Sequence, residues 1–180
     1  MSSSSATSFK VKLLLCGPAA VGKTSLIKRF VKNAFQGDYK LTIGVDILTK
    51  DVMMRNQEVA TLSIWDVGGQ KRFEFIRTTF YKGASGAILV FDLTRAETYQ
   101  EVTEKWAPEL IRNCGQIPFI LIGNKADLVE KVGRVMDPQE AVNWANANGS
   151  IYLETSALGG QNVDEAFIEI TERMRARSGN

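Results

Sequence analysis

The sequence predicts an α/β fold in which a mostly parallel sheet is covered by helices on both faces. Three observations predict it. Short β-rich segments alternate with segments of helical periodicity, two of the β-rich segments are apolar almost throughout, and no linker or repeat interrupts the alternation. Strands that are apolar throughout are typical of a sheet buried on both faces. At 180 residues the chain is long enough for one domain with a substantial core.

The first half of the chain opens with the segment FKVKLLLC, which predicts a strand at 9–16. A helix is expected at 23–35, because Leu26, Ile27 and Phe30 recur on one helical face. Two further β-rich segments flank the polar tetrapeptide RNQE, which is typical of a hairpin. These two strands are expected at 45–54 and 59–66.

The second half continues the alternation. GAILVFD (86–92) and IPFILIG (117–123) are the nearly uniform apolar strands, and SIYLE (150–154) is a last short one. Helical periodicity fills the intervals between these strands. The four later helices are expected near 72–83, 96–113, 137–148 and 162–176.

The composition excludes several classes of function. The chain contains no histidine, which excludes histidine acid–base chemistry, histidine metal sites and histidine pH switches. A net charge of +2 is too small to indicate a nucleic-acid partner. Cys16 and Cys114 are far apart in sequence and favour a reducing compartment over a disulfide framework. We expect a disordered Ser-rich tail at 1–8, and no apolar run approaches the ~20 residues of a membrane span.

A glycine turn follows the first strand. Gly17–Thr24 (GPAAVGKT) matches the pattern G-x-x-x-x-G-K-[ST] between a predicted strand and a predicted helix. Glycines let the backbone wrap an anion, and the helix N-terminus adds partial positive charge. Lys23 is expected to reach the β- and γ-phosphates of a nucleotide, and the Thr24 hydroxyl to bind Mg²⁺. The alternative is an ordinary strand–helix turn, and the motif alone does not specify the base.

Two later segments add to this interpretation. Asp66 ends an apolar strand in LSIWDVGGQ, where a carboxylate suits a role near Mg²⁺. Gly69 is expected to offer a backbone N–H to a γ-phosphate, and Gln70 to orient an attacking water. An ordinary glycine-containing turn is the alternative.

The segment LIGNKADL places Asn124, Lys125 and Asp127 after a buried strand. The Asp127 carboxylate is expected to accept two hydrogen bonds from guanine N1–H and N2–H₂, a donor pair that adenine lacks. Lys125 is expected to lay its alkyl stem along the base. The backbone N–H of Ala157, in ETSAL (154–158), is expected to reach guanine O6. Taken separately, these segments also fit a common turn and a helix cap.

Together these segments resemble the small GTPases of the Ras superfamily over residues 9–176, with five guanine-nucleotide motifs in order. The resemblance implies a P-loop NTPase G domain at 9–177, followed by a short C-terminal end at 178–180. The implied fold is a six-stranded, mostly parallel sheet with five helices on both faces and an antiparallel second strand. The implied cofactors are GTP or GDP and Mg²⁺.

The resemblance also implies roles for residues. Thr42 matches the threonine of switch I, the segment around it, and Gln70 matches the hydrolytic glutamine of switch II, the segment that follows Asp66. Phe35 matches the aromatic residue that flanks the guanine ring, and Tyr39 matches the tyrosine that covers the phosphates. The implied catalytic residues are Gln70, Lys23 and Thr42, and the implied metal ligands are Thr24, Thr42 and Asp66. The implied nucleotide-binding residues are Gly17, Ala20, Val21, Gly22, Lys23, Thr24, Ser25, Phe35, Tyr39, Thr42, Asp66, Gly69, Asn124, Lys125, Asp127, Ser156 and Ala157.

Within the superfamily, LTIGVD, FYKGASGAILVFDLT and NKADL look like Rab proteins, whereas WDVGGQ looks like the switch II of Arf proteins. The chain ends without prenylation cysteines and lacks Gly at position 2, so we expect a cytoplasmic protein. Peripheral membrane association is then expected through a lipidated tail absent from this sequence or through partners.

The expected partners are effectors, exchange factors and GTPase-activating proteins that bind switch I and switch II. Ile47 and Trp65, with Phe80 or Tyr81, form the candidate effector patch; the alternative is that Trp65 packs in the core. No arginine lies between Phe35 and Asp46, so we expect slow intrinsic hydrolysis, of about 10⁻⁴ to 10⁻² per second, unless an activating protein supplies one. The competing hypotheses are a nucleotide-binding scaffold with little hydrolysis and a metabolic P-loop kinase.

Overall fold

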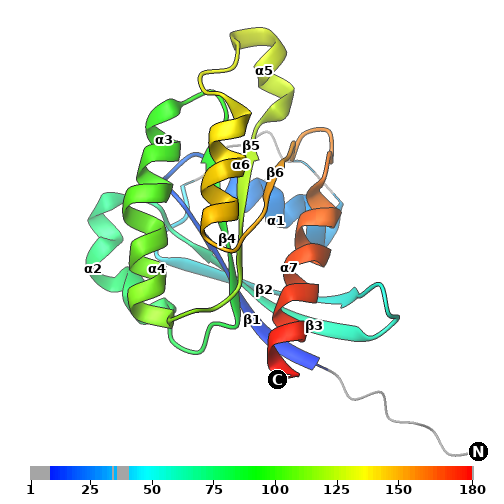
Figure 1. Ribbon diagram of the computed structural model, residues 1–180. Coiled ribbons are helices and arrows are strands. Elements are labelled where there is room, and N and C mark those ends of the chain that lie inside the picture. The colour runs from blue at the N-terminus through cyan, green and yellow to red at the C-terminus, as the bar shows by residue number, and fades with distance from the viewer. Residues whose placement is uncertain (1–8, 34, 36–40, 180) are drawn as a thin grey trace, which may run out of the picture.

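The computed structural model describes residues 9–33, 35 and 41–179, and they form a single six-stranded sheet between two layers of helices (Figure 1). The spatial order of the strands is β2-β3-β1-β4-β5-β6. β2 pairs antiparallel with β3, and every other pair is parallel, which confirms the predicted sheet. The strands are β1 (Phe9–Cys16), β2 (Val45–Met53), β3 (Val59–Val67), β4 (Gly86–Asp92), β5 (Phe119–Asn124) and β6 (Tyr152–Glu154).

The helices follow the expected alternation, but two of the predicted helices are interrupted. The segment predicted as a helix at 72–83 is a series of short turns, and a π-helical turn joins the two α-helical halves of the predicted helix at 96–113. The helical elements are α1 (Lys23–Lys32), η1 (Lys71–Phe73), α2 (Glu74–Arg77), η2 (Thr78–Phe80), α3 (Ala96–Glu101), η3 (Val102–Trp106), α4 (Ala107–Cys114), α5 (Ala126–Val132), α6 (Pro138–Ala147) and α7 (Val163–Ser178).

The expectation of five helices was incomplete because it missed α5. The helix has only seven residues, fewer than the roughly 11 to 18 over which helical periodicity is read, and none of them is fully buried. The first helix also ends earlier than expected, since Asn33 adopts a left-handed conformation (φ 49°) that terminates it after Lys32.

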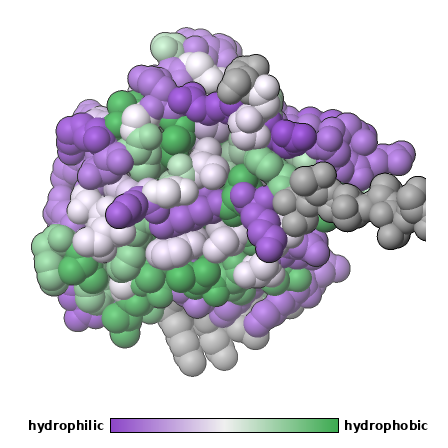
Figure 2. All heavy atoms as spheres, turned by 90° about the horizontal axis from the view of Figure 1, so that it is seen from below, coloured by the Kyte–Doolittle hydropathy of each residue, from purple (hydrophilic) through white to green (hydrophobic). Residues whose placement is uncertain are grey.

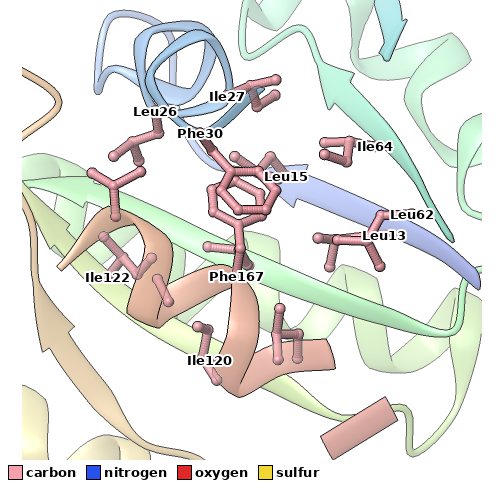
Figure 3. Close-up of a cluster of buried hydrophobic side chains, with 14 of the residues drawn as sticks. Leu13, Leu15, Leu26, Ile27, Phe30, Leu62, Ile64, Ile120, Ile122 and Phe167 are labelled. Carbon is pink, nitrogen blue, oxygen red and sulfur yellow. The ribbon is translucent and has the colours of Figure 1, made fainter. Parts of the chain in front are cut away.

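Two hydrophobic clusters fill the space between the sheet and the helices. On one face, α1 and α7 cover β1, β3, β4 and β5, and the rings of Phe30 and Phe167 stack with centroids 4.0 Å apart (Figure 3). On the other face, Phe91, Trp106 and Leu110 belong to a second cluster that also includes α6. The sheet is therefore buried on both sides, as its apolar strands predict.

Figure 2 shows the molecule from below relative to Figure 1, and on this face hydrophilic and hydrophobic residues are intermingled. None of the described helices is both long and apolar enough to cross a membrane.

The parallel strands place their following loops at one edge of the sheet. The glycine turn follows β1, the Gly68–Gln70 loop follows β3, and the segment that begins at Lys125 follows β5. In open α/β sheets, ligands bind at the carboxyl ends of the strands. The topology thus brings together segments more than a hundred residues apart in sequence.

Candidate functional site

The backbone of the glycine turn depends on its two outer glycines. Gly17 has φ +148°, and a Cβ atom there would lie 2.2 Å from the Val90 carbonyl oxygen. Gly22 has φ +99°, and a Cβ atom there would lie 2.3 Å from Nδ2 of Asn124. Because side chains at either position would collide with buried groups of β4 and β5, glycine is required at both.

Lys23 lies at the start of α1 and reaches back over the turn. Its Nζ atom donates to the carbonyl oxygens of Gly17, at 2.7 Å, and Pro18, at 2.9 Å. Burial lowers the pKa of Lys23 to about 8, although the nearby charge of Asp66 acts in the opposite direction. A buried ammonium gains from a counter-anion, and a phosphate group bound in the turn would supply one.

Three oxygen-bearing side chains meet beside the turn. The Thr24 hydroxyl donates to Oδ2 of Asp66 at 2.5 Å and lies 2.8 Å from the Thr42 hydroxyl. The Thr42 hydroxyl also donates to Oδ2 of Asp66, at 3.2 Å. These residues come from α1, switch I and the end of β3, and the sequence predicted all three as metal ligands.

The environment of Asp66 fits a cation. Its side chain is buried, and its Oδ1 atom has no hydrogen-bond partner among the described residues. Burial raises the pKa of Asp66, and hydrogen bonds from Thr24 and Thr42 and the charge of Lys23 only partly offset that rise. Mg²⁺ prefers hard oxygen ligands and commonly binds one or two carboxylates together with phosphates and water. A single carboxylate beside two hydroxyls matches that preference.

Switch II lies directly against the glycine turn. A Cβ atom on Gly69 would lie 2.4 Å from the backbone nitrogen of Ala19, so a larger residue does not fit. The N–H of Gly68 donates to the carbonyl oxygen of Gly44 at 2.7 Å, which joins switch II to the segment after Thr42. The Nε2 atom of Gln70 is buried and has no hydrogen-bond partner among the described residues.

A pocket of about 330 Å³ opens beside the glycine turn. Asn124 connects the two, since its Nδ2 donates to the Val21 carbonyl at 3.0 Å and its Oδ1 accepts from Thr155 at 2.9 Å. The Asp127 carboxylate accepts a hydrogen bond from the Ser156 hydroxyl at 2.8 Å. The residues that line the pocket are Ala20, Gly22, Ser25, Phe35, Asn124, Lys125, Asp127, Leu128, Ala157 and Leu158.

The structure therefore gathers the described site residues that the sequence predicted, in two adjoining sets. One set surrounds the glycine turn and Asp66, and the other surrounds the pocket. Tyr39 lies outside the described residues. Sequence reasoning missed Arg95, which donates to the Ala19 carbonyl of the glycine turn. It also missed Asp92, which forms ion pairs with Arg95 and Lys125. A signal for Asp92 was present, because an aspartate that ends an apolar strand is the pattern that singled out Asp66.

The candidate effector patch is only partly as predicted. Ile47 is 49% exposed, and the rings of Trp65 and Phe80 lie 6.4 Å apart. Tyr81 is 1% exposed and packs in the core, so it is unavailable to an effector. Trp65 is half-buried against the core and carries the Lys12 ammonium 3.5 Å from its ring centroid. It therefore belongs partly to the core, which was the alternative interpretation.

This sheet, the glycine turn at its carboxyl edge and the adjoining pocket define a P-loop nucleotide-binding protein of the α/β class. The model of the Ras family matches residues 12–176. The chain is 41% identical to the mouse (Mus musculus) Ras-related protein Rab-25, over 94% of this chain and 78% of the relative. It is 38% identical to the Arabidopsis thaliana Ras-related protein RABG3e, over 89% of this chain and 80% of that relative. It is 39% identical to the Dictyostelium discoideum Ras-related protein Rab-7a, over 87% of this chain and 78% of that relative.

The chain belongs to the Ras family. It is a Rab-like small GTPase, a class of guanine-nucleotide switches that hydrolyse GTP and act in membrane traffic.

Proposed function

We propose that the protein binds GTP and GDP with the base in the 330 Å³ pocket and the phosphates over the glycine turn. The observation that carries this proposal is the position of Asp127. It lines a pocket that is joined to the turn through Asn124 and Lys125, whose Nζ donates to the Ala20 carbonyl at 2.7 Å. A carboxylate there selects guanine, because adenine offers no matching donor pair and leaves the acceptor unpaired.

The phosphate end of the site divides the work among several groups. Thr24, Thr42 and Asp66 would hold Mg²⁺, which supplies neutralising charge to the phosphates. Lys23 stabilises negative charge on the same phosphates, and Gln70 orients the attacking water. The remaining nucleotide contacts come from the residues that the sequence assigned, including Ser25, Phe35, Ala157 and the glycine-turn N–H groups.

Regulation of the cycle falls to protein partners. No arginine lies between Phe35 and Asp46 in switch I, and Arg77 of switch II is engaged with Glu109, so we expect an activating protein to supply the arginine that speeds hydrolysis. Effectors are proposed to bind switch I and switch II around Ile47, Trp65 and Phe80. We propose a single GTPase domain at 9–177 and a cytoplasmic location with peripheral membrane association.

Calorimetry tests the base assignment. With Mg²⁺ present, GDP is expected to bind the full-length chain at least a hundredfold more tightly than ADP. Asp127→Asn is expected to weaken GDP binding and to strengthen binding of xanthosine diphosphate, whose 2-carbonyl accepts from the new amide. Asp164→Asn, at an exposed position of α7, is the matched control. Equal affinities for GDP and ADP would overturn the proposal.

A further inference from the structure

Asp92, at the end of β4, holds two cations. Its Oδ2 atom lies 3.0 Å from Nζ of Lys125 and 3.1 Å from Nε of Arg95. Its Oδ1 atom accepts from the backbone N–H of Thr94 at 2.8 Å and from the Thr94 hydroxyl at 2.7 Å. The carboxylate is 2% exposed, so this arrangement is fixed by partners on every side rather than by solvent. Burial acts to raise the pKa of Asp92, but the hydrogen bonds from Thr94 and Lys125 outweigh it and leave the pKa lowered.

Both cations reach onward to the glycine turn, and they contact consecutive peptides. Nζ of Lys125 donates to the carbonyl oxygen of Ala20 at 2.7 Å. Nη2 of Arg95 donates to the carbonyl oxygen of Ala19 at 3.2 Å. Arg95, on the loop after β4, therefore contacts the turn although it belongs to none of the sequence motifs.

These contacts fix the direction of the N–H groups inside the turn. The described peptide bonds are all trans, and in a planar trans peptide the carbonyl of one residue and the N–H of the next point in opposite directions. A donor that holds the Ala19 carbonyl therefore turns the Ala20 N–H away from Arg95. In the same way, Lys125 sets the direction of the Val21 N–H. Ala20 has φ +67°, a conformation that a residue with a side chain adopts at a cost and that surrounding contacts must hold.

We propose that Arg95 is a positioning residue for phosphate binding. Anchored by Asp92, it holds the Ala19–Ala20 peptide so that the Ala20 N–H faces the phosphates. This inference rests on the proposed binding of guanine nucleotides over the glycine turn. Arginine suits the role because its planar guanidinium presents donors in fixed directions, one to Asp92 and one to Ala19, whereas a lysine ammonium is a point charge.

The competing explanation is that Arg95 forms an ordinary surface ion pair. Its side chain is 37% exposed, and exposed ion pairs commonly contribute little to stability. The two explanations differ in what they predict for the glycine turn. A surface ion pair does not alter the Ala20 amide, whereas a positioning residue does.

The test uses the full-length, GDP-bound protein with Mg²⁺ and compares Arg95→Ala, Arg95→Lys and the control Arg112→Ala. Arg112 is an exposed arginine of α4. The first measurement is the rate of GDP release. Arg95→Ala is expected to speed release by about 3- to 10-fold, the effect of losing one ordinary hydrogen bond. Arg95→Lys is expected to lie between the wild type and Arg95→Ala, and Arg112→Ala to match the wild type.

The second measurement is the ¹H–¹⁵N spectrum of the bound state. A general loss of stability would not shift the Ala20 amide selectively. In Arg95→Ala the Ala20 amide is expected to move toward higher field as its hydrogen bond to phosphate weakens, while the Val21 amide stays in place. In Asp92→Asn, which loosens both cations, the Ala20 and Val21 amides are expected to move together.

The outcomes separate this inference from the proposed function. If the wild type does not retain GDP, the proposed function fails. If the wild type retains GDP but Arg95→Ala releases it at the wild-type rate with an unmoved Ala20 amide, only the positioning role of Arg95 is overturned. Faster release with a displaced Ala20 amide and partial rescue by lysine supports it.

Discussion

The C-terminal half of switch II is anchored by a buried ion pair, and its removal yields a measurable loss of stability. Arg77 donates to Glu109 through Nε at 2.8 Å and through Nη2 at 3.1 Å, and the Tyr81 hydroxyl donates to the same carboxylate at 2.7 Å. The guanidinium also lies 3.9 Å from the ring centroid of Trp106. Arg77 and Glu109 are 5% and 7% exposed, so solvent cannot replace either partner.

We predict that Arg77→Ala lowers the free energy of unfolding by about 3 to 5 kcal/mol, because it leaves the Glu109 carboxylate buried with one remaining donor. For a chain of this size such a loss corresponds to a fall in Tm of roughly 6 to 20 °C. The double variant Arg77→Leu with Glu109→Leu is expected to recover part of the loss, since it removes both charges together but leaves the Tyr81 hydroxyl without its acceptor. Tyr81→Phe, which removes one hydrogen bond to a charged group, is expected to cost about 1.5 to 3 kcal/mol.

The assay is urea denaturation at a fixed, saturating concentration of GDP, because bound ligand adds to the apparent stability and must be the same for every variant. Equal slopes of the unfolding free energy against urea concentration would show that the variants expose the same surface area on unfolding. A loss below about 1 kcal/mol for Arg77→Ala, or a double variant no more stable than the single one, would refute the reasoning that the charges are desolvated.

Three further predictions concern the core, the metal and pH. Phe30→Ala is expected to cost about 3 to 5 kcal/mol in the same denaturation assay, because it removes a stacked ring from the core, whereas Phe75→Ala, at a side chain that is 79% exposed, should change stability by less than about 0.5 kcal/mol. A chelator such as EDTA should speed GDP release from the wild type at least tenfold, and Asp66→Asn should release GDP quickly even with Mg²⁺ present; a chelator effect that survives undiminished in the variant would count against Asp66 as a metal ligand. The fold holds the pKa of Asp92 below its ordinary value, so the ionised carboxylate stabilises the protein fully above a pH of about 4. This stabilisation is lost as the pH falls through the folded-state pKa of Asp92. In an acid titration, Asp92→Asn should therefore show a shallower decline in stability than the wild type.

The sheet was predictable because its evidence is local. Uniformly apolar segments such as 86–92 identify buried strands without knowledge of their neighbours, and a glycine turn between a strand and a helix orients the first βα unit. The helix α5 was not predictable in this way. At seven residues it is too short for periodicity to identify, and its N-cap residue, Lys125, has a left-handed backbone (φ 70°) that composition does not reveal.

The candidate site followed the same division. Gly17, Lys23 and Asp66 stand in short patterns whose chemistry is readable from the sequence, and the structure brings them together; their contacts with nucleotide and metal stay predictions. Arg95 stands in no such pattern. Its contact with Ala19 exists because β4 lies beside β1, so that the loop after one strand meets the loop after the other. Contacts of this kind depend on topology and become visible only in three dimensions.

The hydrogen bond between Gly68 and Gly44 prolongs the β2–β3 ladder beyond its last paired residues, into both switches. The two loops consequently share one mechanical linkage. A protein that grips switch I and draws it outward must either rupture that bond or carry the start of switch II along. Because the next residue, Gly69, lies against the glycine turn, displacement of one loop would also disturb the turn over which we propose that the phosphates bind.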